Sequence, residues 1–429
     1  MSAPDLSLLA KRRFAPLFVV QFLGAFNDNL LKFAMLFLAN FTLYAAAPAK
    51  AEQLATIATG LFILPYFLLS ALAGQVADKW DKAWLIRAIK GAEVGIMTLA
   101  LVGFWFQSVP VLLTCLFLMG VHSTLFGPVK YSILPQLLGR HELMGGTGLI
   151  EAGTFLAILT GQLLGGVIQA WQAGLAAIGV ATLGLLASLA IPSAPAAAPD
   201  LRIDRNIWKG TWEILAVARS GRGVWLAVVG ISWFFAVGAI LLSEFAPLVS
   251  GTLHAGPGVV TLFLLVFSIS VAAGSLVVNR LLGGEVSARY VPFAALGMAV
   301  FLIDLWIATG RYDGAVPQAD IAAFWASAGS AHILVALTGL ALSGGIFIVP
   351  LYAILQVRTD PAERSRVIAA NNIVNALVTV AMVVVVTLLL ALGLSVPGVI
   401  GVMGFATLPI ALGARRLTVS GAERAEVPR

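Results

Sequence analysis

The stretch FGPVKYSILPQLLGRHELMGGTGLIE, residues 126–151, returns in altered form as FIVPLYAILQVRTDPAERSRVIAANN, residues 347–372. The two copies align without a gap when position 126 is set against position 347. Five residues are then identical, and in the first copy they are Phe126, Tyr131, Ile133, Leu134 and Glu142. Each copy runs from the end of one long apolar segment, through a polar loop, into the next apolar segment. We therefore expect a chain built from two similar halves.

Long apolar segments surround both copies. Because about 20 apolar residues cross the hydrocarbon core of a bilayer, the sequence predicts twelve membrane spans. They cover approximately residues 15–45, 54–77, 84–106, 110–134, 146–169, 172–191, 224–249, 258–280, 289–309, 330–355, 367–392 and 396–414. The repeated stretch joins the fourth span to the fifth and the tenth to the eleventh. Two six-helix halves in parallel repeat are a plan that many transporters use.

The composition excludes a soluble globular protein. Hydrophobic residues make up 60% of the 429 residues and charged residues 11%, against about 25% charged in a soluble domain. The first apolar stretch follows Lys11, Arg12 and Arg13 without a small-residue cleavage site, so we expect a retained helix and not a cleaved signal. The single cysteine, Cys115, excludes a disulfide within the chain.

The longest polar interruption, residues 192–222, separates the predicted halves. It begins with the Pro/Ala-rich PSAPAAAPD and continues as the basic, Trp-containing RIDRNIWKGTWEI. The second part predicts a short amphipathic helix at the membrane interface. We expect three parts: an N-terminal six-helix half, 1–191, a cytoplasmic linker, 192–222, and a C-terminal six-helix half with a cytoplasmic tail, 223–429.

The distribution of basic residues predicts the orientation. With both termini in the cytoplasm, all but four of the 26 Lys and Arg lie in cytoplasmic termini, loops or helix ends. The four exceptions are Lys50 and Arg311 in outer loops and Lys32 and Lys130 within spans. So large an asymmetry indicates that both termini are cytoplasmic. Topology also accounts for the basic balance of the chain, so nucleic acid is not an expected partner.

A short motif after the second span resembles a signature of the major facilitator superfamily. The chain reads GQVADKWDK from Gly74 to Lys82, and the signature is G-x-x-x-D-R/K followed by basic residues. A degenerate copy, GSLVVNR, occupies the corresponding place in the second half. Gly74 permits close helix approach, and Asp78 could pair with a cation to hold one conformation. The resemblance implies an all-α major facilitator fold in which Gly74, Asp78 and Lys79 govern conformational gating.

Within the superfamily the chain resembles the LplT-type lysophospholipid transporters over nearly its whole length. The segments that carry this resemblance are QFLGAFNDNLLKFA (21–34), GQVAD (74–78), FGPVKYSIL (126–134), GLIEAGT (148–154), GGIFIVPLYAILQ (344–356) and AANNIVNA (369–376). The resemblance implies a flippase of the bacterial inner membrane that returns lysophospholipids from the outer to the inner leaflet. A separate acyltransferase and acyl-carrier-protein synthetase would then re-acylate them.

Two features depart from that pattern. Some members carry an arginine in the seventh span, whereas residues 232–247 here contain Glu244 and no basic residue. The chain also lacks the H-x4-D pair of an acyltransferase, since Asp follows none of its histidines at that spacing: His122, His141, His254 and His332. We find no nucleotide loop, metal cluster or nucleophile motif. We therefore expect a transporter without enzyme activity and without a cofactor.

The first span carries its most polar residues at its centre, in FLGAFNDNLLKF, residues 22–33. Asp28 lies about thirteen residues into the span, roughly 20 Å and near the midplane. Because Lys32 is four residues further on, the two share a helix face. Either they form an internal ion pair, or Asp28 lines a central cavity and contacts substrate. Asn27 and Asn29, to either side, could contact substrate or satisfy neighbouring helices.

Further polar residues lie in the repeated stretches. Lys130 could extend its side chain to the interface or bind substrate, and Glu151 could pair with it as a gate or a ligand. Asn372 stands at the repeat position of Glu151, and Asn375 follows one turn later. Hydrogen bonding between helices is the alternative role for both asparagines. Lys90 and Glu93 are expected to be structural.

A lysophospholipid has one acyl tail, a phosphate and often an ethanolamine amine. A carboxylate suits the amine and a lysine suits the phosphate, so Asp28 and Lys130 are the principal predicted ligands, supported by Asn27 and Glu151. The complete predicted substrate site contains Asp28, Asn27, Lys130, Glu151, Asn29, Lys32, Asn372, Asn375, Tyr131 and Tyr352. We expect a monomer surrounded by membrane lipids, in which alternating access of the two halves would carry the headgroup across the membrane. The alternative is a proton-coupled exporter of small amphiphilic compounds, with Asp28 or Glu151 as the proton carrier.

Overall fold

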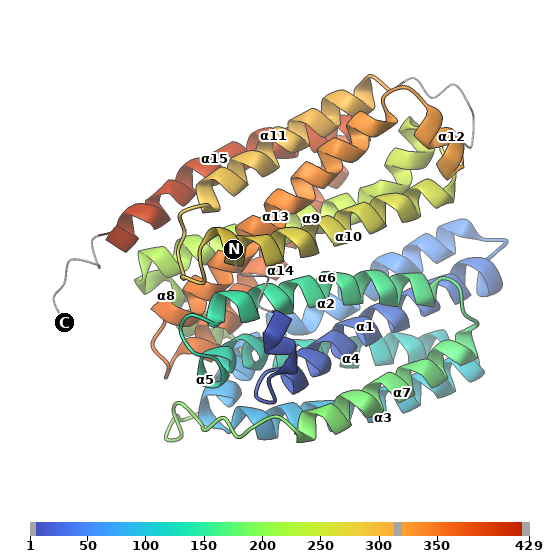
Figure 1. The fold of residues 1–429 in the computed structure, drawn as a ribbon. Coiled ribbons are helices and arrows are strands. Elements are labelled where there is room, and N and C mark those ends of the chain that lie inside the picture. The colour runs from blue at the N-terminus through green and yellow to red at the C-terminus, as the bar shows by residue number, and fades with distance from the viewer. Residues whose placement is uncertain (1–5, 313–319, 423–429) are drawn as a thin grey trace. The chain divides into compact units, whose positions relative to one another are not determined.

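The protein is built from long helices (Figure 1). The computed structural model describes residues 6–312 and 320–422, and this part of the chain contains no strand. The α-helices are α1 (Ala15–Leu38), α2 (Pro48–Lys79), α3 (Lys82–Trp105), α4 (Val109–Ser132), α5 (Leu134–Leu137), α6 (Leu143–Gly165), α7 (Ala170–Leu189), α8 (Ile207–Ser220), α9 (Arg222–Pro247), α10 (Pro257–Leu281), α11 (Val291–Gly310), α12 (Ile321–Ala326), α13 (Ser330–Arg358), α14 (Arg364–Ala391) and α15 (Val396–Ala422). A 3-10 helix, η1 (Leu6–Ala10), precedes α1, and the π-helical turns η2 (Ala39–Leu43) and η3 (Leu248–Thr252) extend α1 and α9.

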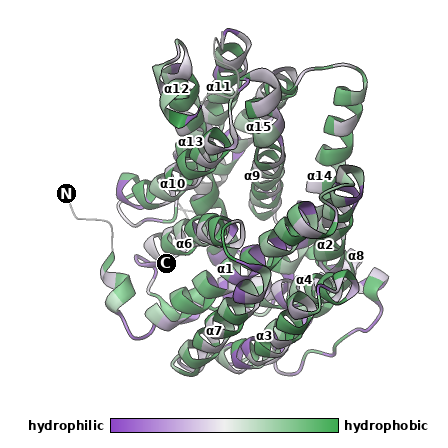
Figure 2. Ribbon diagram, turned by 90° about the vertical axis from the view of Figure 1, so that its right-hand side faces the viewer, coloured by the Kyte–Doolittle hydropathy of each residue, from purple (hydrophilic) through white to green (hydrophobic). Residues whose placement is uncertain are grey.

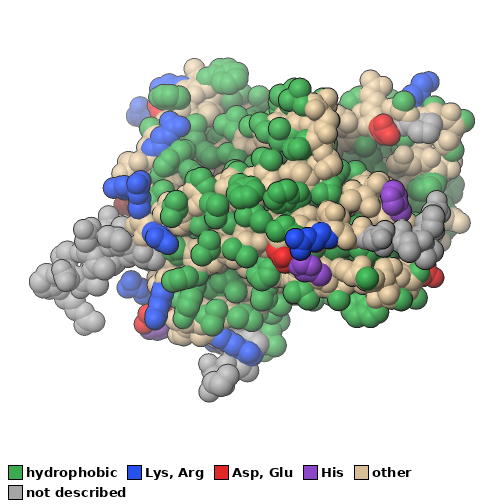
Figure 3. All heavy atoms as spheres, turned by 90° about the horizontal axis from the view of Figure 1, so that it is seen from above, with side chains coloured by type: hydrophobic (Ala, Val, Ile, Leu, Met, Phe, Trp, Pro, Cys, Tyr) green, Lys and Arg blue, Asp and Glu red, His purple; other side chains and the backbone are tan. Residues whose placement is uncertain are grey.

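Each of the twelve predicted spans corresponds to one long helix. Eleven helical segments of the described chain are long and apolar enough to cross a membrane. The remaining predicted span forms α3, which carries Lys90 and Glu93 in its first half and packs between α4 and α7. The long helices are mainly hydrophobic along their length in Figure 2. On the face drawn in Figure 3, hydrophobic side chains are far more extensive than charged ones.

Local sequence signals explain where several helices begin. Proline occupies the first turn of α1, α4, α10 and α11, where its missing N–H is not needed and its φ suits a helix. The carboxylate of Asp81 accepts a hydrogen bond of 2.9 Å from the backbone N–H of Trp84 and caps α3. The predicted amphipathic helix is present as α8, which leaves Trp208 80% and Trp212 69% exposed.

The chain divides into two compact units. One contains residues 1–220 and 355–373, and the other contains residues 221–354 and 374–429. The linker and α8 belong to the first unit, as do the end of α13 and the start of α14. The repeat is visible in the helices, because α4 and α13 begin at Val109 and Ser330, and α6 and α14 at Leu143 and Arg364, with 221 residues separating the members of each pair.

In the first unit, α1 packs between α6 and α7, α2 packs against α4, and α3 packs against α4 and α7. Glycines permit the close contact of α1 with α6. A Cβ added to Gly165 would lie 3.0 Å from the backbone of Leu30 and Ala34, and Gly161 faces the backbone of Phe26 in the same way. This small-xxx-small spacing brings two helix backbones together in a membrane.

The linker is attached to the ends of α2 and α3. The backbone N–H of Ala198 donates to the carbonyl of Asp78 at 2.9 Å, and the Lys79 Nζ donates to the carbonyl of Leu201 at 2.8 Å. Gln75 Oε1 accepts from the N–H of Asp204 at 2.7 Å. α8 then packs on α2 through its buried Gly210.

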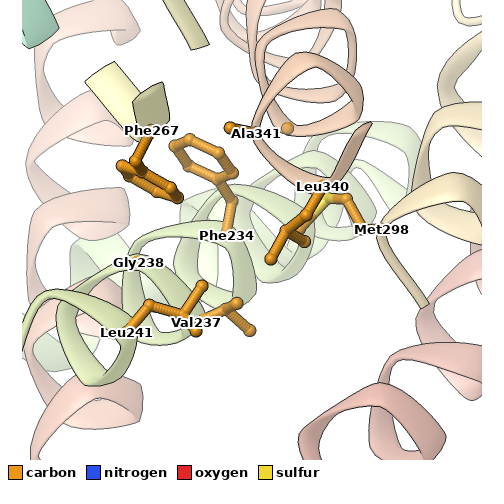
Figure 4. Close-up of a pocket in the computed structure, with 9 residues that line it drawn as sticks. Phe234, Val237, Gly238, Leu241, Phe267, Met298, Leu340 and Ala341 are labelled. Atoms are coloured by element: carbon orange, nitrogen blue, oxygen red, sulfur yellow. The ribbon is translucent and has the colours of Figure 1, made fainter. Parts of the chain in front are cut away.

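In the second unit, α9, α10, α11, α13 and α15 pack with close glycine contacts. Figure 4 shows Phe234 and Phe267 beside a cavity that α9, α10, α11 and α13 enclose. Its volume is about 10 Å³ and its lining is apolar, so it barely reaches the size that holds one water. This cavity is a packing defect and is too small for a substrate.

The N-terminal segment is fastened to the start of α6 by Glu142. Its carboxylate accepts hydrogen bonds from Lys11 Nζ at 2.6 Å, Arg13 Nη2 at 2.7 Å and the N–H of Gly139 at 2.9 Å. The hydrogen bond from Lys11 is the largest of the effects that lower the pKa of Glu142 below its ordinary value of 4.5. Because the pKa of Glu142 is lower in the folded protein than in the unfolded chain, the ionised carboxylate stabilises the fold above pH 4.5. This stabilisation is lost as the pH falls through the lowered pKa.

We predict that Glu142→Gln exchanges its N-terminal amides, residues 8–18, roughly fivefold faster at neutral pH, since exposed ion pairs contribute up to about 1 kcal/mol. Hydrogen–deuterium exchange read by mass spectrometry measures the effect. At a pH below the lowered pKa of Glu142 the wild type and the variant should exchange alike. Equal exchange at neutral pH would contradict the role given to Glu142.

Candidate functional site

Asp28 lies on α1 and faces α4. The hydroxyl of Ser123 donates to Asp28 Oδ2 at 2.8 Å, whereas Oδ1 is buried and has no hydrogen-bond partner in the described chain. The structure describes both Asp28 and Lys32, and no ion pair within 4.0 Å joins them. The internal ion pair that the sequence offered as an alternative is therefore not formed. A buried polar atom without a partner is uncommon and calls for a functional explanation.

The asparagines beside Asp28 point to other helices. Asn27 is fully buried, and its Nδ2 donates to Glu93 Oε1 at 2.9 Å and to the carbonyl of Ala177 at 3.1 Å. Asn29 Nδ2 donates to the carbonyl of Ala25 on its own helix, and its Oδ1 accepts from Gln162 Nε2 at 3.3 Å. Both asparagines thus donate hydrogen bonds to neighbouring groups, and Asn27 Oδ1 has no hydrogen-bond partner in the described chain.

Lys130, Tyr131 and Glu151 form a second polar group. Lys130 Nζ lies 4.5 Å from the centre of the Tyr131 ring, and the Tyr131 hydroxyl donates to Glu151 Oε1. Glu151 is fully buried, with Oε2 unpartnered in the described chain. Within the described residues, neither Glu151 nor Asp28 forms an ion pair with the Lys130 ammonium within 4.0 Å. Tyr131, and not Lys130, is the direct partner of Glu151.

Asn372, at the start of α14, faces α4 at Gly127. A Cβ added to Gly127 would lie 2.9 Å from Asn372 Nδ2, so glycine is needed here to leave room for the amide. Asn372 Nδ2 and both polar side-chain atoms of Asn371 are buried without a hydrogen-bond partner in the described chain. Asn375 and Tyr352 belong to the second unit, where Tyr352 is buried and contacts the ring of Phe235.

One face of α4 connects these groups. Ser123, Gly127 and Lys130 are spaced i, i+4 and i+7, and this spacing places them on one helix face. Ser123 bonds to Asp28, Gly127 lies against Asn372, and Lys130 contacts the ring of its neighbour Tyr131, which bonds to Glu151. We call this set the α4 polar stripe: Asp28, Ser123, Lys130, Tyr131, Glu151 and Asn372. It extends about 10 Å along the helix axis and offers an acid, an ammonium and an amide.

A separate cluster of charges is buried in the same unit. Lys90 pairs with Glu93, whose Oε2 lies 3.2 Å from His122 Nε2, and all three side chains are at most 3% exposed. Gly24 leaves room for the ammonium, since an added Cβ would lie 2.9 Å from Lys90 Nζ. The i, i+3 spacing of Lys90 and Glu93 was readable in the sequence. Nothing there connects the pair to His122, which the sequence analysis missed.

Asp78, at the end of α2, holds the start of α14. Its buried carboxylate accepts from the N–H of Ser365 at 3.0 Å and from the N–H and Nε of Arg366, each at 3.2 Å. The first turn of a helix favours an anion, because its N–H groups are free and its dipole is positive there. Gly74 permits the approach, since an added Cβ would lie 2.8 Å from Ala369 Cβ and 2.9 Å from Arg366 Cα. Lys79 binds the linker instead.

The comparisons with known proteins agree with this architecture. The family model of the Major Facilitator Superfamily matches residues 17–381. The chain therefore belongs to the major facilitator superfamily. Its curated relatives include the lysophospholipid transporter LplT of Cronobacter sakazakii (strain ATCC BAA-894), 30% identical over 83% of each chain, and that of Serratia proteamaculans (strain 568), 29% identical over 86% of each. The resemblance to LplT-type lysophospholipid transporters is thus confirmed.

Solved transporters share the fold. The structure is similar to the human organic anion transporter MFSD10, with a TM-score of 0.71 and 16% identity, covering 93% of this chain and 99% of that one. It is also similar to the E. coli fucose:proton symporter FucP, with a TM-score of 0.67 and 14% identity, covering 94% and 98%. At these identities the likeness establishes the fold alone.

We predict that Gly74→Ala separates the end of α2 from the start of α14, because the added Cβ has no space. A cysteine placed at Ser365 in a Cys115→Ser background should then be alkylated several-fold faster. Gly95→Ala is the matched control, since an added Cβ there meets nothing within 4 Å. Unchanged alkylation in Gly74→Ala would refute the close contact.

The buried charge cluster generates a stability prediction. Glu93→Leu leaves the Lys90 ammonium buried without its partner, at a cost of about 3–5 kcal/mol. The double variant Lys90→Leu/Glu93→Leu removes both charges and should recover most of that loss. Thermal unfolding of the purified protein in detergent measures both. A double variant no more stable than the single one would show that the pair is not coupled.

Proposed function

We propose that this protein is a flippase that moves lysophospholipids from the outer to the inner leaflet of a bacterial inner membrane, with both termini cytoplasmic. Its relatives' name supports the substrate class. The α4 polar stripe, with the carboxylate of Asp28 and the ammonium of Lys130, supports a ligand that carries both a positive and a negative charge. The released lysophospholipid would be re-acylated by a separate acyltransferase and acyl-carrier-protein synthetase.

The observation that carries the proposal is the unpartnered state of the stripe's polar atoms. Asp28 Oδ1 can accept from a lipid amine, and the Lys130 ammonium can bind a phosphate. The Asn372 amide, whose Nδ2 has no partner in the described chain, can donate to a second phosphate oxygen. Ser123 holds Asp28 in position through its other oxygen. Charge-assisted hydrogen bonds of this kind are the stronger ones.

The Asp78 contact supports alternating access as the mechanism. It joins α2 to α14 through three hydrogen bonds to one buried carboxylate. Breaking these bonds while Asp78 stays buried would leave its charge unpaired, so the contact favours two distinct arrangements over a continuum. In this mechanism Gly74 and Asp78 hold one arrangement, and substrate movement requires its release.

Lysophospholipid transport in vesicles tests the site. Asp28→Asn and Lys130→Gln should each lower the initial rate about tenfold or more, as expected when a hydrogen bond to a charged group is lost. Glu244→Gln is the matched control, because Glu244 is an acid of α9 outside the stripe, and it should keep the wild-type rate. Wild-type rates in both stripe variants would exclude this site.

Proton-coupled export of small amphiphilic compounds remains the second candidate. The observation in its favour is Glu151, a fully buried acid with one oxygen unpartnered in the described chain. Uptake that collapses with the proton gradient and does not prefer single-chain lipids would support export. Transport of single-chain lipids that persists without a gradient would support the flippase.

A further inference from the structure

A groove lies on the first unit between α2 and the linker, away from the α4 polar stripe. Its volume is about 350 Å³, within the range of small-molecule sites. One wall is α2, at Leu69, Ala71 and Leu72. The other wall is the end of the linker and the first residue of α8, residues 203–207. Figure 2 shows α8 beside α2.

The linker wall carries one acid, Asp204, and one base, Arg205. The carboxylate of Asp204 accepts from the N–H of Asn206 at 2.8 Å and from Lys209 Nζ at 3.0 Å. These contacts lower the pKa of Asp204, with the backbone hydrogen bond from Asn206 as the largest cause, so the acid is ionised and paired at neutral pH. Arg205 is exposed and has neither an ion pair nor a hydrogen bond to its side chain in the described chain. Its guanidinium is free to bind an anion.

The opposite wall is apolar and belongs to α2, a helix long and apolar enough to cross a membrane. Leu69 and Leu72 are partly exposed on α2, and Leu69 lies ten residues before Lys79 at the helix end, so about 15 Å from it. Ile203 and Ile207 continue the apolar lining on the linker side. The groove therefore has a basic group, Arg205, on the linker side and an apolar wall on α2. These features match the anionic phosphate and the acyl chain of a phospholipid.

Tryptophans mark the level of the membrane surface beside the groove. Trp208 and Trp212 are one turn apart on α8 and both largely exposed. Trp80 and Trp84, at the junction of α2 and α3, are 42% and 54% exposed and contact each other edge to face. Trp is enriched at membrane–water interfaces. Four exposed tryptophans around one linker place Arg205 at the height of lipid headgroups.

We propose that this groove binds one anionic diacyl phospholipid of the leaflet on the linker side. Its phosphate pairs with Arg205, and an acyl chain lies along Leu69 and Leu72. A bound lipid would hold the linker against α2 and so stabilise the folded protein. The inference is independent of the transported substrate, because no residue of the α4 polar stripe lines the groove.

Thermal unfolding of the purified full-length chain in detergent tests the proposal, with phosphatidylglycerol as the probe. Added phosphatidylglycerol should raise the unfolding temperature of the wild type. Arg205→Glu should abolish the shift, and Arg205→Ala should raise the half-saturating lipid concentration roughly fivefold, as one basic residue near anionic lipid is expected to do. Arg205→Lys should largely restore it. Arg202→Ala is the matched control, an exposed linker arginine that does not line the groove, and should respond as the wild type.

Three results would overturn the proposal. An equal loss in Arg202→Ala would show attraction to general surface charge. An equal shift with the single-chain lysophosphatidylglycerol, or with zwitterionic phosphatidylethanolamine, would show that neither the second chain nor the net charge is recognised. A shift that survives Leu69→Ser/Leu72→Ser, with the variant folded by its unfolding transition, would show that no acyl chain lies on α2. A failed flippase assay would leave all these outcomes unaffected.

Discussion

The hydrogen bond from Ser123 to Asp28 is the contact on which the candidate site depends. An ionisable side chain in the hydrocarbon core costs at least a few kcal/mol unless protein or water meets it. Ser123 satisfies one oxygen of Asp28 and leaves the other unpartnered in the described chain. The i, i+4 and i+7 spacing on α4 then brings Gly127 and Lys130 to the same side of the helix as Ser123. A site with one held and one open oxygen has a defined geometry before any ligand arrives.

Two kinds of buried charge occur within one helix bundle. In the Lys90–Glu93–His122 group the Glu93 carboxylate lies close to both bases and accepts a further hydrogen bond from Asn27, while His122 Nδ1 has no hydrogen-bond partner in the described chain. The α4 polar stripe is open, with unpartnered atoms on Asp28, Glu151 and Asn372. Since His122 and Ser123 are adjacent on α4, the two groups lie on neighbouring sides of the same helix.

The sequence predicts the helices well because bilayer thickness and periodicity are properties of single segments. The twelve spans follow from apolar segments read one at a time, the repeat follows from residues 126–151 and 347–372, and α8 follows from the amphipathic residues 202–214. Side-chain partners depend on packing between segments, and here prediction was weaker. Asp78 was recognised from its motif, but its partners Ser365 and Arg366 are almost 290 residues away and carry no local signal. The same reason explains why Tyr131, and not Lys130, contacts Glu151.

The linker between the halves is long enough to be a loose tether, yet its backbone is joined to α2 at three successive places. Asp78, Lys79 and Gln75 each bond to it, and Asp78 also bonds to α14 through its carboxylate. The end of α2, the linker and α8 are consequently held together by hydrogen bonds as well as by the chain. Asp78 belongs to two contacts at once, because its carbonyl bonds to the linker and its carboxylate bonds to the start of α14.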